Sequence, residues 1–256
     1  MRVSIRSVVV VTALVAASSL VVAQQAPVAD PLIRENATVK LGAHTFAIPD
    51  NNVGLVPNVG FVVGTRATLV IDPGLGRRNG EIVLREVAKV SKNAELYIVS
   101  THFHAEHTTG YLAFPAAPAA RYINSRVQEE EFEQGGLQMV QMFSKRSPFT
   151  AEILAGTTRR VADITFDREH TLDLGGVTVR MLLVGPGHTR GDTAFFIEQD
   201  RVLFTGDFVM NNSFVAAGNA ATMKGWLSGF DQLDALKPTT IVPAHGAVGT
   251  GAVIAA

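Results

Sequence analysis

Four side chains of metal-ligand type lie within six consecutive residues of this chain. They are His102, His104, Glu106 and His107 in the segment THFHAEH, and three of the chain's seven histidines are among them. In an extended or tightly turning segment, His102 and His104 project to the same side, and the next residues can turn back toward the same space. The chain has no Cys. Imidazoles and a carboxylate are the ligands that Zn²⁺ and related divalent ions prefer when no thiolate is available, so the segment predicts a metal site.

Three further residues of ligand type follow apolar runs later in the chain. They are His188 in GPGHT, Asp207 in TGD and His245 in PAHG. Each is flanked by small residues that let the backbone approach closely. Taken singly, Asp207 is also explained as a turn residue and His245 as a cap. Convergence on one metal site explains the repetition.

The elements that must position these residues are short β-type runs, broken by Gly, Pro and Asp, with helical segments between some of them. The ligand segments come directly after strand-like runs, at the sheet edge where ligand sites of α/β folds usually lie. One domain is the simplest organisation. The pattern predicts strands at 38–48, 60–63, 68–71, 96–99, 121–123, 177–184, 194–197, 202–204 and 240–242, and helices at 80–91, 125–143 and 223–236.

The region 114–156 is the least regular part of the sequence. Ser125 and Gln128 can form a capping box at the start of a helix, and the acidic run 129–133 is typical of a solvated helix face. The apolar residues that follow fit either core positions or a lid over a cleft. These residues are Met139, Met142, Phe143 and Phe149.

The motifs HFHAEH, GPGHTRGD, LFTGD and VPAHG, in this order, resemble those of the metallo-β-lactamase-fold hydrolase superfamily. The resemblance extends from Asn58-Val59-Gly60 and Val70-Ile71-Asp72-Pro73-Gly74 to Gly246. It implies an α/β fold, a four-layer αβ/βα sandwich with the metal site at one edge of two facing sheets.

The resemblance also implies roles for individual residues. His102, His104 and His188 would hold one metal ion, and Asp207 would bridge it to a second. Asp72 would support the metal loop through hydrogen bonds, as a carboxylate that orients a ligand histidine does. The ligands of the second ion would be Glu106, His107 and His245.

Glu106 stands where the family usually has Asp. Its extra methylene shifts the carboxylate by roughly a bond length, whereas metal sites tolerate only about ±0.2 Å in ligand distances. Either Glu106 still ligates the second ion, or it swings away and leaves a mononuclear site or a free acid or base. Ala244, where the family often has Gly, is a milder departure.

Composition and the N-terminal segment limit the partners and the location. With 22 basic and 23 acidic residues, the chain has no positive surplus for a nucleic-acid backbone. Residues 1–23 are typical of a signal peptide, with cleavage expected after Ala23, because the apolar run is short for a membrane span. Residues 24–35 then form a tether, and 36–256 the hydrolase domain. We therefore expect a periplasmic or secreted protein without a stable membrane anchor, and the sequence does not indicate its oligomeric state.

These observations predict an exported metal-dependent hydrolase of a small molecule. The expected cofactor is Zn²⁺, one or two ions, with iron or manganese as alternatives, and a metal-bound hydroxide would cleave a small ester, lactone, thioester or amide. Asp207 and Glu106 would take part in catalysis. One alternative is a β-lactamase, and a second is an iron-binding sulfur-oxidising or non-catalytic member of the fold. Gly74-Leu75-Gly76-Arg77-Arg78-Asn79-Gly80 departs from the dinucleotide-binding spacing and is interpreted as a turn.

Overall fold

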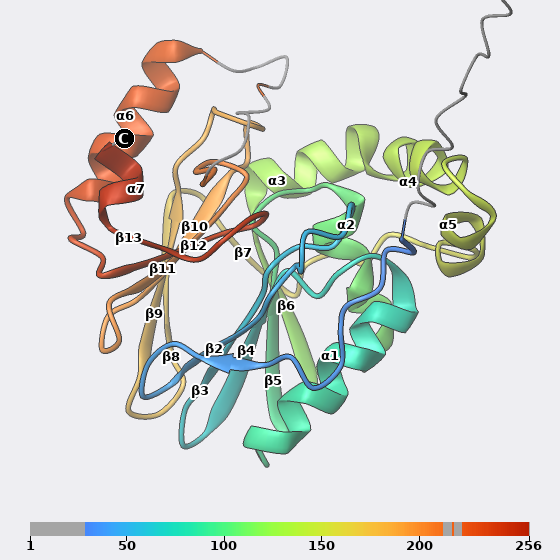
Figure 1. Cartoon of the computed structure of the whole chain (residues 1–256), viewed down its shortest axis with the longest axis horizontal. Coiled ribbons are helices and arrows are strands. Elements are labelled where there is room, and N and C mark those ends of the chain that lie inside the picture. The colour runs from blue at the N-terminus through green and yellow to red at the C-terminus, as the bar shows by residue number, and fades with distance from the viewer. Residues whose placement is uncertain (1–28, 212–216, 218–221, 256) are drawn as a thin grey trace, which may run out of the picture.

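A computed structural model describes residues 29–211, 217 and 222–255. The expected signal peptide, residues 1–23, lies outside the described residues. Two sheets face each other, and helices cover the outer side of each, which gives the four-layer αβ/βα sandwich that the motifs predicted (Figure 1). Within the described ranges, no helix is both long enough and apolar enough to span a membrane.

The first sheet has seven strands in sequential order, with β4, β5, β6 and β7 parallel to one another. Parallel strands end at the same edge, so the segments that follow them meet there. The strands are β1 (Val39–Lys40), β2 (Thr45–Ile48), β3 (Val59–Val63), β4 (Ala67–Ile71), β5 (Glu95–Val99), β6 (Ala120–Ser125) and β7 (Ile164–Phe166).

The second sheet has six strands in the order β13-β12-β11-β10-β9-β8. Strands β11 and β12 are parallel. Strand β10 lies between β9 and β11 and is antiparallel to each of them, so β9 runs in the same direction as β11 and β12. Its strands are β8 (Glu169–Asp173), β9 (Thr178–Leu183), β10 (Thr193–Ile197), β11 (Val202–Gly206), β12 (Thr240–Pro243) and β13 (Gly249–Thr250).

The helices lie outside the sheets or along the edge where the ligand segments meet (Figure 1). Helix α1 (Gly76–Val90) covers the first sheet, and α6 (Met223–Asp234) and α7 (Ala252–Ala255) cover the second. The helical segments along the edge are α2 (Ala105–Thr108), the 3₁₀ turn η1 (Thr109–Ala113), α3 (Arg126–Glu131), the π-helical turn η2 (Phe132–Gly136), α4 (Leu137–Ser144) and α5 (Pro148–Ile153).

The core lies in three layers because each sheet buries both faces. Leu69, Ile71, Phe195 and Phe204 pack between the sheets and are at most 2% exposed. A second cluster fills the space between the first sheet and α1, and a third, with Trp226, lies under α6. Strands buried on both faces are nearly continuous apolar runs, which is why most of them could be predicted from sequence.

Two expected elements are divided in the structure. The predicted strand 38–48 breaks into β1 and β2, because the carboxylate of Asp200 accepts hydrogen bonds from Ala43 N, His44 N and Thr45 Oγ1 and holds a turn between them. The predicted helix 125–143 is a run of α3, η2 and α4, and the π-helical turn η2 begins at Phe132 and ends with Gly135 and Gly136. Its start is correct, since the Ser125 side chain caps Gln128 N.

Residues 29–35 are the described part of the expected tether. Ile33 is 3% exposed, and its backbone N donates to the side chain of Asn79 in α1 at 2.8 Å. The Asn79 amide in turn donates to Pro31 O. Contacts with the domain therefore begin before residue 36.

Candidate metal centre

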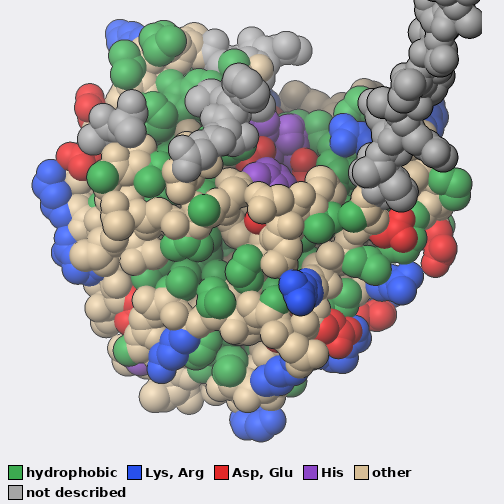
Figure 2. Space-filling model, viewed as in Figure 1, with side chains coloured by type: hydrophobic (Ala, Val, Ile, Leu, Met, Phe, Trp, Pro, Cys, Tyr) green, Lys and Arg blue, Asp and Glu red, His purple; other side chains and the backbone are tan. Residues whose placement is uncertain are grey.

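All seven predicted ligand residues meet at the edge where β4, β5, β9, β11 and β12 end. Figure 2 shows the histidine side chains in a hollow, next to acidic side chains. Three overlapping sets within this cluster have ligand atoms within 4.8 Å of one another. They are His102, His104 and His188; His102, His107 and Asp207; and Glu106, His107 and His245.

The segment after β5 supplies four of these residues because it makes a sharp turn. His104 has an extended backbone, and its carbonyl accepts from His107 N and Thr108 N, both at 3.1 Å, as α2 begins. The single turn of α2 brings Glu106 and His107 back toward His102. This is the fold-back that the spacing of the motif predicted.

The first trio combines two side chains of this segment with His188, which follows β9. His104 Nδ1 lies 3.2 Å from His188 Nε2. The ring of His102 is within 4.7 Å of both other rings, centroid to centroid. The three imidazoles therefore surround one point.

Asp207 lies between the first trio and the set Glu106, His107 and His245, which we call the second trio. Its Oδ2 is 3.5 Å from His188 Nε2 and 4.0 Å from His102 Nε2, and its Oδ1 is 3.8 Å from His245 Nε2. Gly206, before it, has a left-handed backbone, and a Cβ there would lie 2.5 Å from Thr101 Cβ. The glycine therefore lets the β11 segment reach the β5 segment.

Several buried atoms of the candidate ligands make no hydrogen bond to one another. Among the described residues, His102 Nε2, His107 Nε2, Glu106 Oε2 and Asp207 Oδ1 are buried and have no hydrogen-bond partner. Since buried polar atoms are nearly always paired, four such atoms in one cluster fit coordination of a metal ion. A nitrogen and oxygen donor set of this kind fits Zn²⁺ and related ions.

Burial also sets the protonation of the cluster. It lowers the pKa of His102 well below its usual range and that of His107 to about 3, with neighbouring imidazoles adding to the effect at His102. Neutral imidazoles are the form that binds metals. Burial, with a smaller contribution from the nearby Asp207, raises the pKa of the Glu106 carboxyl to about 8. A bound cation would stabilise the ionised form of this carboxyl, which burial disfavours.

Asp72, at the end of β4, joins two parts of the centre. Its carboxylate accepts from Thr101 N at 2.7 Å and Thr101 Oγ1 at 2.8 Å, and it lies 3.0 Å from His107 Nδ1. This is the supporting position that the resemblance implied. Burial raises the pKa of Asp72 to about 7, and the bonds from Thr101 oppose that rise.

The segment of His245 is held by two residues before β3. Asn58 Nδ2 donates to the carbonyl oxygens of Pro243 and Gly246, both at 2.8 Å, on either side of the histidine. The Asp50 carboxylate accepts from Gly246 N at 2.8 Å. Sequence reasoning missed Asp50, because only the fold brings it beside residue 246.

The segment of His188 is held by a carboxylate of its own loop and by one from α3. The Asp192 carboxylate accepts from Thr189 N and Thr189 Oγ1. The Glu131 carboxylate accepts from Arg190 N at 3.0 Å and Gly191 N at 2.8 Å. The interpretation of the acidic run 129–133 as a solvated face is therefore wrong for Glu131, and also for Glu129, which is 8% exposed and pairs with Arg159.

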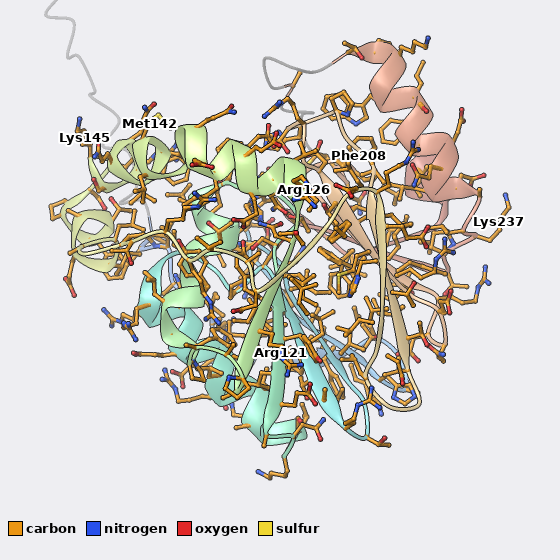
Figure 3. All side chains as sticks on the ribbon, turned by 180° about the vertical axis from the view of Figure 1, so that it is seen from behind. Arg121, Arg126, Met142, Lys145, Phe208 and Lys237 are labelled. Carbon is orange, nitrogen blue, oxygen red and sulfur yellow. The ribbon has the colours of Figure 1, made fainter. Side chains whose placement is uncertain are left out.

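The four apolar residues singled out in the region 114–156 differ in burial, and Met139 and Phe149 are partly buried. Phe143 is 4% exposed and packs with Val140 and Leu154, whereas Met142 points outward from α4 (Figure 3). His44 and His170 lie outside the ligand sets. Helix α1 begins at Gly76, four residues before its predicted start, so the interpretation of residues 74–80 as a turn is wrong for residues 76–80.

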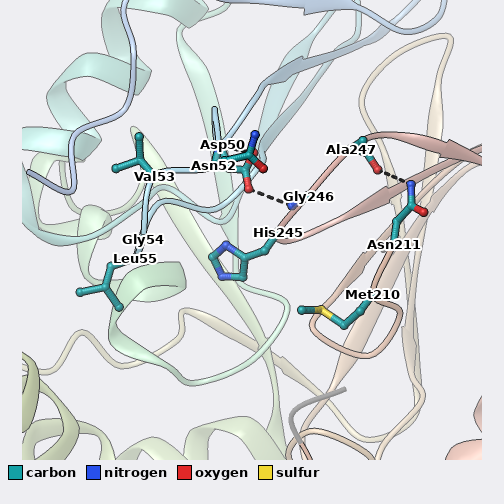
Figure 4. A pocket seen from close by; sticks show the side chains of 10 residues that line it. All are labelled: Asp50, Asn52, Val53, Gly54, Leu55, Met210, Asn211, His245, Gly246 and Ala247. Atoms are coloured by element: carbon teal, nitrogen blue, oxygen red, sulfur yellow. Dashed lines mark hydrogen bonds between the residues drawn. The ribbon is translucent and has the colours of Figure 1, made fainter. Parts of the chain in front are cut away.

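A cavity of about 570 Å³ opens beside His245. Figure 4 shows the 50–55 segment on one side of the imidazole and Met210 with Asn211 on the other. Asn51, Asn52 and Leu55 have left-handed backbones, which are uncommon for a leucine. Asp50 and Asn58 fix this wall, so the cavity and the His245 ligand share one support.

Comparison with known proteins identifies the family. Residues 53–245 match the model of the metallo-beta-lactamase superfamily. The chain belongs to the metallo-β-lactamase superfamily. It is thus related to the hydrolases of that superfamily, and the matched range contains every predicted ligand and Asp72.

The curated relatives include the lactamase-like protein aptB of Emericella nidulans, 26% identical over 192 residues, which are 73% of this chain and 50% of that protein. An atrochrysone carboxyl ACP thioesterase of Aspergillus fumigatus is 25% identical over 73% of this chain and 37% of its own length. The chain spans about half the length of the curated relatives it matches.

Solved structures support the fold. A metallo-beta-lactamase from Pontibacter korlensis superposes with a TM-score of 0.68 at 19% identity, over 85% of this chain and 94% of that one. The DIM-1 metallo-beta-lactamase gives 0.67 at 19% identity, over 87% and 94%. At such low identity the likeness concerns the fold of this superfamily member, not its substrate.

Proposed function

We propose that this protein is a dinuclear zinc hydrolase that cleaves a small ester, lactone, thioester or amide. The observation that carries the proposal is the pair of ligand trios on either side of Asp207, with four buried ligand atoms that lack a partner among the described residues. His102, His104 and His188 would hold one ion and Glu106, His107 and His245 the other. Bound zinc would lower the pKa of a coordinated water and polarise the scissile carbonyl.

The side chains of the protein orient the candidate ligands and supply negative charge to the centre. Asp72 keeps the Nε2 lone pair of His107 directed into the centre, since Nδ1 is engaged by the carboxylate. Asp207 contributes charge to both sides. Glu106 Oε2 is buried and unpaired near His107 and His245, which favours ligation over the free acid or base that its extra methylene left open.

The cavity beside His245 favours substrates that carry no negative charge near the scissile bond. Its described lining has no Lys or Arg, and Asp50 is the one acidic residue in it. The sequence between Asn211 and Thr222 also has no Lys or Arg. A β-lactam carries a carboxylate beside its ring, so this wall offers it no cation. The thioesterase among the relatives supports the ester and thioester classes.

A β-lactamase is the second candidate, since the structural neighbours named above are metallo-β-lactamases. One experiment separates the two. A lactone, a thioester, a phosphodiester and a cephalosporin are assayed with metal content measured on the same sample. Turnover of the lactone or thioester with about two equivalents of zinc supports the proposal. Turnover of the cephalosporin alone favours the lactamase, and one iron per chain favours the oxidative alternative.

His107→Ala and His170→Ala form a matched pair for this assay. Both remove an imidazole, but His170 lies outside the ligand sets. Loss of turnover and of zinc in His107→Ala alone is expected. Equal activity in both variants would refute the metal centre.

We also propose that the protein is exported, because residues 1–23 have the pattern of a signal peptide. The test is the N-terminus of the protein recovered from a bacterial periplasmic fraction. A mature chain that begins at Gln24 is the expected result, and an intact Met1 in the cytoplasm would overturn it.

A further inference from the structure

One face of α3 contacts both segments that carry the first ligand trio. Gln128 Nε2 donates to Ser100 O at 3.1 Å, just before the His102 segment. One turn later, Glu131 accepts from Arg190 N and Gly191 N, just after His188. Residues three apart on a helix lie on the same side, so a single helix face spans the gap between these segments.

These contacts are shielded from solvent. Gln128 is fully buried, and the Glu131 side chain is 11% exposed. A carboxylate that accepts from two consecutive backbone N–H groups makes charge-assisted bonds, which are stronger and shorter than neutral ones. Arg190 Nε, 3.5 Å from Glu131 Oε1, adds a partner of opposite charge.

The packing at Gly191 leaves no room for adjustment. A Cβ at this position would lie 2.8 Å from Glu131 Oε2 and 2.9 Å from Gln128 Cα. The His188 segment is therefore seated directly on α3. His188 lies only two and three residues before the two N–H groups that Glu131 binds, so displacement of the segment would displace the imidazole.

From this geometry we propose that Gln128 and Glu131 are positioning residues for the first metal ion. They hold the His102 and His188 segments at a fixed separation and thereby set the geometry of the trio His102, His104 and His188. This rests on the proposed function only in taking that trio as a metal site. Neither residue belongs to the ligand sets.

The test is Co²⁺ titration of the metal-free mature chain, followed by the visible absorption of the bound ion, which reports ligand geometry. Glu131→Ala should weaken the tighter binding step by about 10- to 100-fold, as losses of supporting groups do, and change the spectrum. Glu130→Ala removes the same charge from the adjacent, exposed position and should match the wild type. Glu131→Gln keeps one acceptor oxygen, so its Co²⁺ affinity should lie between those of Glu131→Ala and the wild type.

The outcomes are distinguishable. If the wild type binds no Co²⁺, the proposed function fails. If the wild type binds it and Glu131→Ala binds it with the same affinity and spectrum, only the positioning role is overturned. If Glu131→Ala does not fold, judged by near-ultraviolet circular dichroism, Glu131→Gln decides by the same measurement, and wild-type affinity there overturns the proposal.

Discussion

The Oδ2 atom of Asp72 lies 3.0 Å from Nδ1 of His107, and the same oxygen accepts from Thr101 Oγ1. With the carboxylate ionised, His107 Nδ1 carries the hydrogen and Nε2 presents its lone pair to the metal centre. One side chain thus sets the tautomer of a ligand and ties the β4 segment to the β5 segment.

Asp72→Asn should weaken metal binding while the fold persists. The amide has one acceptor oxygen in place of two, so it cannot accept from all three donors, Thr101 N, Thr101 Oγ1 and His107 Nδ1, as the carboxylate does. We expect about 10- to 100-fold weaker zinc binding, measured by competition with a chromophoric chelator. Asp167→Asn makes the same change in an exposed ion pair with Arg126 and serves as the control. Equal affinities in the two variants would contradict an orienting role.

Glu106 decides whether the second ion has a carboxylate ligand. Glu106→Asp should retain or raise zinc occupancy, because the shorter side chain restores the usual residue of the family. Glu106→Ala should lose about one equivalent of zinc, measured on dialysed protein by elemental analysis. Glu133→Ala, at an exposed position on η2, is the control. Unchanged metal content in Glu106→Ala would remove Glu106 from the ligands.

Sequence alone predicted that the candidate ligands come together, because local pattern determines their positions. Apolar runs mark strands buried on both faces, and a polar residue just past such a run lies at the sheet edge. The elements that escaped prediction lack this signal. Strand β8 (EHTLD) is mostly polar at the sheet margin, β7 has three residues, and α5 has six.

The supports of the ligands could be predicted only in part. Asp72 follows a strand and belongs to a motif, so it was found. Glu131 and Asp50 act on backbone groups 59 and 196 residues away, at Arg190 and Gly246. An acidic helix face looks the same in sequence whether water or a backbone segment covers it, because the pattern carries no information about distant N–H groups.

The metal-free protein should be most stable near pH 6.5. Below this value the unfolded chain protonates its histidines, whereas folded His107, with a pKa of about 3, stays neutral, so stability falls as pH falls. The folded pKa of Glu106, about 8, lies above its ordinary 4.5, so its contribution is lost as pH rises through 8. Between pH 4.5 and pH 6.5 the buried histidines raise the free energy of unfolding as pH rises, whereas Glu106 and Asp72 lower it. The histidines outnumber these two carboxyls, so the net stability rises up to pH 6.5.

Thermal unfolding with a chelator, from pH 4 to pH 9, measures this profile. Glu106→Gln mimics the protonated carboxyl and should reduce the alkaline decline. A melting temperature that rises steadily from pH 6 to pH 9 in the wild type would contradict the assigned protonation states.

Asn58 should be essential for the position of His245 and for stability. Asn58→Ala leaves the carbonyl oxygens of Pro243 and Gly246 without their donor. An unpaired buried group costs about 1–3 kcal/mol, so we expect the free energy of unfolding to fall by about 2–4 kcal/mol. Asn58→Asp is expected to be worse, because it removes the donor and brings a negative charge toward two carbonyl oxygens and Asp50.

Urea unfolding and zinc affinity, measured on the same variants, separate the two effects. Asn93→Ala loses two side-chain hydrogen bonds, to Gly64 O and Thr68 Oγ1, at the opposite edge of the first sheet. It should lower stability without changing zinc affinity, whereas the Asn58 variants should lower both, since they release the segment that carries a ligand. If Asn58→Ala and Asn93→Ala bound zinc equally well, Asn58 would be a structural residue with no role in the metal centre.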